Sequence, residues 1–105
     1  MKKFLIVLFF LVFATPIYAD NWRKGCEVAS AYATAIMESR QAGVAMSRLM
    51  ELTKEEGPKD DQSLIEMIII DAYDRPRYST EPMQQRAMEE FRDDTYLKCV
   101  KTNKK

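Results

Sequence analysis

The sequence predicts a small all-α protein, a four-helix up-down bundle closed by one disulfide. Apolar residues recur at steps of three and four through residues 64–73, the most apolar run after the N-terminal segment, as expected of an amphipathic helix. Glycine and proline divide the rest of the chain into segments of helical length. Two cysteines, Cys26 and Cys99, lie near opposite ends of the chain, where one bridge would join its first and last helices.

Residues 1–19 have the pattern of a secretory signal peptide. Lys2 and Lys3 precede an uncharged apolar run, 4–14, and Ala19 stands before a polar residue, as at a cleavage site. A membrane anchor is the alternative, but a spanning helix needs about 20 apolar residues and this run is too short. We therefore expect a periplasmic or secreted protein in which residues 20–105 form a single helical domain without a membrane span.

The first helix is expected to begin at Asp20 or Asn21, whose side chains can cap a first turn. It should run to Gln41 or Ala42 and end at Gly43, because glycine readily adopts the left-handed conformation that follows many helices. Its inner face consists mainly of small residues that permit close packing: Cys26, Ala29, Ala33, Ile36 and Arg40.

The second and third helices are separated by Gly57-Pro58. Met46, Leu49 and Met50 mark the apolar side of the second helix. The third covers residues 64–73 and stops before Pro76, since a residue that precedes proline disfavours helical angles. Its three consecutive isoleucines also permit a strand, but no second strand-like run exists to pair with it. Candidate caps for its first turn are Asp60, Asp61 and Ser63.

The fourth helix is expected to open at Ser79 or Thr80, with Pro82 tolerated in its first turn. Up-down order then places its end beside the start of the first helix, where Cys99 and Cys26 can pair. Such a bridge stabilises the fold by about 4 kcal/mol in the chain-entropy model. A reactive or metal-binding thiol pair is the alternative, but the cysteines lack CxxC spacing. The predicted inner stripe is Met83, Ala87, Met88, Phe91, Thr95 and Cys99.

Composition argues against several classes of function. Without Lys2 and Lys3 the chain has 14 basic and 16 acidic residues, a balance that does not suit nucleic acid binding. It has no histidine, the commonest general base and metal ligand, and no P-loop, nucleophile elbow or dinucleotide motif. We therefore expect no enzymatic activity, no metal and no cofactor, with methionines serving as core filler rather than copper ligands.

The stretch between the third and fourth helices is the candidate partner surface. Two tyrosines and two arginines flank a rigid proline, a composition typical of protein interfaces. Arg40 and Gln41 should lie at the same end of an up-down bundle. The alternative is structural: Pro76 sets the turn, Tyr73 packs inward, and the arginines pair with Asp71, Asp74 or Glu81. The full candidate set is Tyr73, Arg75, Pro76, Arg77, Tyr78, Arg40 and Gln41.

Several of these positions together resemble a set of small exported two-cysteine helical proteins from proteobacteria and their phages. The resemblance is carried by an early Cys26, the sequence Arg40-Gln41-Ala42-Gly43 after an alanine-rich helix, Ala72-Tyr73, Pro76-Arg77 and a late Cys99. It covers most of residues 20–105 and implies no activity. Helical acid-stress chaperones of the periplasm are similar in size and architecture, but their motifs do not map onto this chain.

The expected function is protein binding by an exported module, an inhibitor or an accessory factor of an envelope protein. One alternative is a chaperone-like stress protein that exposes methionine and aromatic surface on acidification. Another is a small envelope hydrolase, which would need converging carboxylates with shifted pKa values.

Overall fold

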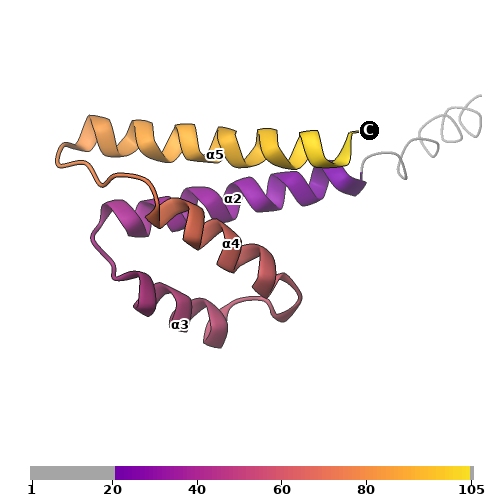
Figure 1. Ribbon diagram of the computed structural model, residues 1–105, viewed down its shortest axis with the longest axis horizontal. Coiled ribbons are helices and arrows are strands. Elements are labelled where there is room, and N and C mark those ends of the chain that lie inside the picture. Colours follow the sequence, from indigo (N-terminus) through magenta and orange to yellow (C-terminus); the bar gives the residue numbers. More distant parts are fainter. Residues whose placement is uncertain (1–20, 105) are drawn as a thin grey trace, which may run out of the picture.

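The computed structural model describes residues 21–104, and over that range its regular elements are helices (Figure 1). The predicted signal peptide lies outside the described residues. The small all-α bundle is confirmed. The elements are α2 (Asn21–Gln41), α3 (Met46–Glu56), the short 3₁₀ turn η2 (Lys59–Asp61), α4 (Gln62–Tyr73) and α5 (Glu81–Asn103).

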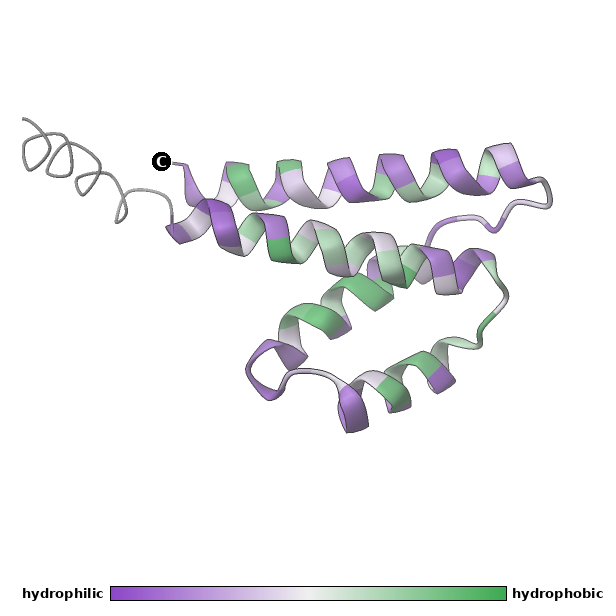
Figure 2. Cartoon of the chain, turned by 180° about the vertical axis from the view of Figure 1, so that it is seen from behind, coloured by the Kyte–Doolittle hydropathy of each residue, from purple (hydrophilic) through white to green (hydrophobic). Residues whose placement is uncertain are grey.

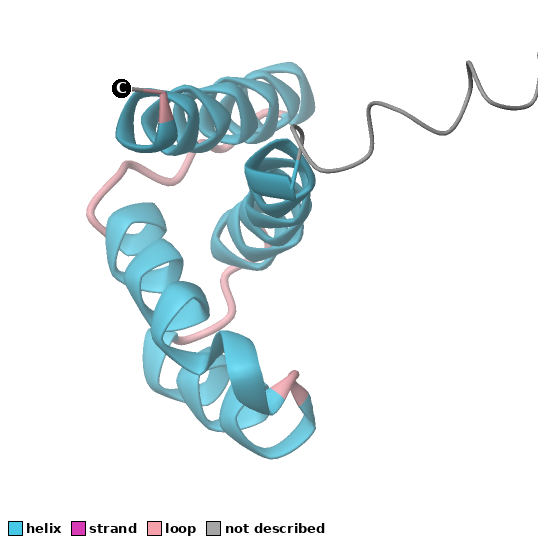
Figure 3. Cartoon of the chain, turned by 90° about the vertical axis from the view of Figure 1, so that its right-hand side faces the viewer, coloured by secondary structure: helices cyan, strands magenta, loops and turns pink. Residues whose placement is uncertain are grey.

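Helix α2 is the centre of the arrangement. It lies beside α5 along most of its length, and the two helices run antiparallel (Figure 1). Helix α4 crosses α2, while α3 packs mainly against α4 (Figure 3). The α3–α4 pair therefore projects from the long α2–α5 pair as a second layer.

The helix ends fall where glycine and proline predict them. Helix α2 stops at Gln41, and Gly43 has a φ of 88°, the left-handed conformation expected there. Helix α3 stops before Gly57, whose N–H donates to the Thr53 carbonyl at 2.9 Å. Helix α5 begins after Thr80 and contains Pro82 in its first turn.

The expected side-chain capping of the third helix is not observed. Asp61 occupies the N-cap position of α4, but its side chain makes no capping hydrogen bond. Its Oδ2 instead accepts a hydrogen bond from the Tyr32 hydroxyl at 2.8 Å. The carboxylate therefore connects η2 to α2, which are far apart in the sequence. A local sequence pattern does not reveal such a long-range contact.

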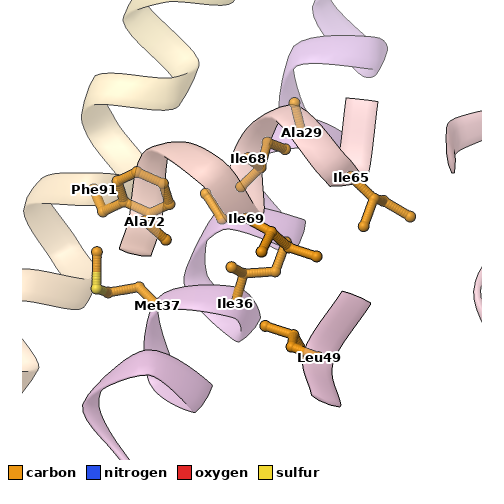
Figure 4. Packing of buried hydrophobic residues seen from close by; sticks show 10 residues of the cluster. Ala29, Ile36, Met37, Leu49, Ile65, Ile68, Ile69, Ala72 and Phe91 are labelled. Carbon is orange, nitrogen blue, oxygen red and sulfur yellow. The ribbon is translucent and has the colours of Figure 1, made fainter. Parts of the chain in front are cut away.

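The hydrophobic core lies where α2 and α4 cross (Figure 4). Ile65, Ile68, Ile69 and Ala72 supply the α4 side, the stripe predicted for the third helix. Figure 2 shows that hydrophobic residues make up much of the length of α4. The remaining buried members of the cluster are Ala29, Ala33, Ile36 and Met37 of α2, Leu49 of α3 and Phe91 of α5.

The Cys26–Cys99 disulfide joins the start of α2 to the end of α5, as predicted. The two Cα atoms are 5.5 Å apart and the bridge spans a sequence separation of 73. Asn103 donates through Nδ2 to the Cys99 carbonyl at 2.7 Å, which secures the last turn of α5 beside the bridge. None of the helices within residues 21–104 has the length and apolar content needed to cross a membrane.

Candidate functional site

The loop between α4 and α5 is bound to the C-terminal end of α2. Arg40 donates through Nε and Nη2 to the Arg75 carbonyl at 3.2 and 3.1 Å. Gln41 donates through Nε2 to the Pro76 carbonyl at 3.0 Å. All seven predicted candidates therefore lie at one end of the molecule, as the up-down order requires.

Gln41 holds the loop through both ends of its side-chain amide. Its Oε1 accepts from the Tyr78 backbone N–H at 2.8 Å, while its Nε2 serves the Pro76 carbonyl. Its main-chain carbonyl also accepts from Nε of Arg77 at 3.0 Å. The side chain is 3% exposed, and a buried amide is stable only when its donors and acceptors are bonded. Two backbone groups of the loop meet that need.

Arg75 connects the α4–α5 loop to helix α5. Its Nη1 lies 2.8 Å from Oδ2 of Asp94 and its Nη2 lies 3.6 Å from Oδ2 of Asp71. The guanidinium also stacks over the Phe91 ring, 4.6 Å from the ring centroid. The structural interpretation of this arginine is therefore confirmed for Asp71, and Asp94 is a partner that sequence spacing did not indicate.

Tyr73 contributes to packing more than to an exposed surface. Its ring is half-buried, and its hydroxyl donates to the Val44 carbonyl at 2.6 Å. The Arg40 guanidinium lies 5.1 Å from the centre of the ring. Burial raises the pKa of the Tyr73 hydroxyl, and the nearby Arg40 charge partly opposes that rise. Tyr73 therefore connects the end of α4 to the α2–α3 turn.

A hollow of about 410 Å³ lies beside the loop, against the first half of α5. Arg75, Pro76 and Tyr78 of the candidate set line it. Sequence reasoning missed the others, although Met83 and Ala87 belong to the predicted inner stripe of α5 and so carried a usable signal. Met37, Met83, Arg86, Ala87 and Glu90 complete the lining.

The chemistry of this hollow suits recognition. Met37 and Ala87 provide apolar surface, and Met83 is 38% exposed at its edge. Arg86 adds a second guanidinium near Arg75, and guanidinium groups bind carboxylates in a bidentate geometry. A side chain with an apolar stem and a carboxylate end matches this combination. No cluster of three or more potential metal ligands occurs among residues 21–104.

Comparison with known proteins identified no relative of this chain. The chain matches no family model, no curated protein and no solved structure. The resemblance to small exported two-cysteine proteins therefore stays a prediction. The candidate site rests on its own geometry.

Proposed function

We propose that this protein is an exported interaction module that binds another protein through the end where the α4–α5 loop meets α2. We call this the loop-end surface: Arg75, Pro76, Arg77 and Tyr78 of the loop with Met83 and Arg86 of α5. The observation that carries the proposal is the fixing of an arginine- and tyrosine-containing loop by the side chains of Arg40 and Gln41. A surface ordered before binding loses little conformational entropy on complex formation.

The composition of the loop-end surface supports a partner with an acidic, partly apolar segment. Tyrosine, arginine and methionine are enriched at protein interfaces, and Pro76 and Arg77 are exposed. The hollow next to them offers apolar contact to a side-chain stem and the exposed Arg86 guanidinium to its carboxylate. An inhibitor or accessory factor of an envelope protein would act through such an exposed acidic segment of its target.

The disulfide supports export. Bridges of this kind persist in oxidising compartments and are rare in the cytosol. The predicted leader at residues 1–19 agrees with that compartment. Periplasmic or secreted localisation is accordingly part of the proposal.

The decisive test compares charge reversals at two exposed arginines. A crosslinking pull-down from envelope extracts identifies the partner, and calorimetry with the purified partner then measures affinity. Arg86→Glu should weaken binding by about tenfold or more, because it opposes the acidic segment and removes an interface arginine. Arg48→Glu makes the same change on the exposed surface of α3, outside the lining of the hollow, and should bind like wild type.

Met83→Glu extends the test to the apolar part of the surface. It should also weaken binding, since a carboxylate would stand at the edge of a site that receives a carboxylate. Equal affinity for wild type, Arg86→Glu and Met83→Glu would show that the partner binds elsewhere. Arg75→Ala and Arg77→Ala are poor probes, because both side chains hold the loop in place.

A further inference from the structure

Helix α4 is amphipathic, but its buried stripe does not include all of its large apolar residues. Ile65, Ile68 and Ile69 are buried, whereas Met67 is 68% exposed and Ile70 is 56% exposed. An amphipathic helix at a protein surface normally turns its large apolar residues toward the core. Adjacent exposed large apolar residues on such a helix indicate an interaction site.

A groove of about 420 Å³ runs along the same side of α4. It lies between α4 and α5 over a floor supplied by Ala29 of α2. Leu64, Met67 and Asp71 lie on the α4 wall. Thr95 and Lys98 lie on the α5 wall, and Lys98 pairs with Asp71 across the groove. Met67 therefore belongs both to the wall of a groove and, with Ile70, to an exposed apolar ridge beside it.

We infer that this ridge-and-groove face binds the same face of a second copy of the chain, forming a two-fold symmetric dimer. In such an interface each copy presents the same patch, which must be complementary to itself. The ridge of Met67 and Ile70 from one copy fills the groove of the other, and the symmetry operation repeats the contact. A ridge and a groove next to each other on one surface meet that requirement.

The charges around the face also fit a second copy. Glu66 is exposed on α4 beside Ile70. Lys98 on the opposite wall is paired with Asp71 of its own chain at 3.1 Å, although its side chain is 65% exposed. Lys101 follows Lys98 by about one turn and is also exposed. When the ridge enters the groove of another copy, Glu66 approaches Lys101 of that copy. Both pairs form at once, so the chain supplies each component of the interface.

The proposed dimer face is separate from the loop-end surface. The groove is lined from α2, α4 and the second half of α5, whereas the loop-end surface uses the α4–α5 loop and the first half of α5. Binding of the partner and self-association can therefore fail independently. If both hold, the dimer presents two loop-end surfaces, and a repeated partner would gain avidity.

The test is the mass of the oxidised protein in solution. Sedimentation equilibrium over a wide concentration range should give a dimer for wild type, with no interchain disulfide on a non-reducing gel. Met67→Glu combined with Ile70→Glu should raise the dissociation constant by about a hundredfold, because it buries unpaired charge in the interface. Met46→Glu places a carboxylate on another exposed methionine, in α3, and should leave the dimer intact.

A charge exchange provides a second measurement that does not touch the apolar ridge. Glu66→Lys and Lys101→Glu should each weaken self-association, and a mixture of the two variants should form a heterodimer. Wild type that is monomeric at every concentration overturns the inference. So does a dimer whose mass is unaffected by the Met67 and Ile70 changes while circular dichroism remains native.

Discussion

Two residues at the C-terminal end of α2, Gln41 and Gly43, lie against the α4–α5 loop. Gln41 is buried and uses its amide to bond two backbone groups of a distant loop. Gly43 has the positive φ that the turn requires, and its Cα faces the Arg77 guanidinium. These two positions, separated by Ala42, therefore connect local backbone geometry to the placement of the loop-end surface.

Replacing Gly43 with alanine should destabilise the protein by about 1–3 kcal/mol, the cost of holding a side chain in a sparsely populated backbone region. The added Cβ would lie 2.9 Å from Nη2 of Arg77, so the guanidinium must also shift. The matched control is Gly25→Ala within α2, where a Cβ meets nothing within 4 Å and helix propensity should improve stability by about 0.5–1 kcal/mol. Urea unfolding of both variants measures the contrast, and equal effects would contradict it.

The Tyr32–Asp61 hydrogen bond makes stability sensitive to alkaline pH. The bond, helped by burial and by the Asp61 charge, raises the pKa of Tyr32 above its ordinary value of 10.0. The unfolded chain therefore loses the proton first, so the contribution is complete below pH 10 and disappears as pH rises through the folded pKa. Unfolding free energies of wild type and Tyr32→Phe should converge at high pH, and near-ultraviolet absorbance should follow the tyrosinate. A constant difference would contradict the linkage.

Small side chains allow α2 to lie between two helices. Ala29 and Ala33 are 2% and 0% exposed, and α2 contacts both α4 and α5. Alanine keeps helix propensity high while adding little volume at the contact. The predicted inner face of the first helix is therefore a packing surface, and it contacts α4 as well as α5.

Enlarging this face should separate the helices. Ala33→Leu is expected to cost about 1–3 kcal/mol, because a packed core does not accommodate extra methylene groups without strain. Ala31→Leu, two residues earlier on the exposed side of the same helix, should be nearly neutral. Thermal unfolding monitored by circular dichroism distinguishes the two, and a similar loss in both would point to helix propensity rather than packing.

The periodicity of the sequence predicted the helices and their buried faces better than it predicted which helices contact one another. Local spacing predicts the buried stripe of α4 and the helix ends at Gly43 and Gly57. The cysteine pairing follows because two cysteines allow only one intramolecular bridge. Local spacing could not show that α3 packs on α4 or that Asp61 serves Tyr32, because those contacts depend on helix crossing. Local spacing also overestimated the burial of the α5 stripe. Met83 is 38% exposed, and Phe91 is the fully buried member of the predicted stripe.

Only part of the candidate site was predicted, because some of its contacts depend on how the helices cross. Up-down order correctly brought Arg40 and Gln41 to the 73–78 loop, since loop ends of antiparallel helices meet. The hollow at that end could not be predicted, because it depends on how far α5 stands from the loop. Whether the surface binds a partner stays a prediction.

At the scale of the whole molecule, the disulfide ties a chain whose core is small. Exchanging Cys26 and Cys99 for serine should lower the free energy of unfolding by about 4 kcal/mol, because the unfolded chain regains the entropy of an open loop. Urea unfolding of the double variant beside oxidised wild type measures the loss. A difference near zero would mean that residual structure in the reduced, unfolded chain already keeps its two ends close together.

The same bridge makes the polypeptide between its two sulfurs a covalent ring. A protease that nicks the backbone once inside this ring, for instance at the exposed connection near Pro58, opens it without releasing a fragment. The nicked molecule keeps its mass until a reductant is added, and only then separates into two pieces. In a protease-rich environment, this protein would thus remain one covalent molecule after a first cut.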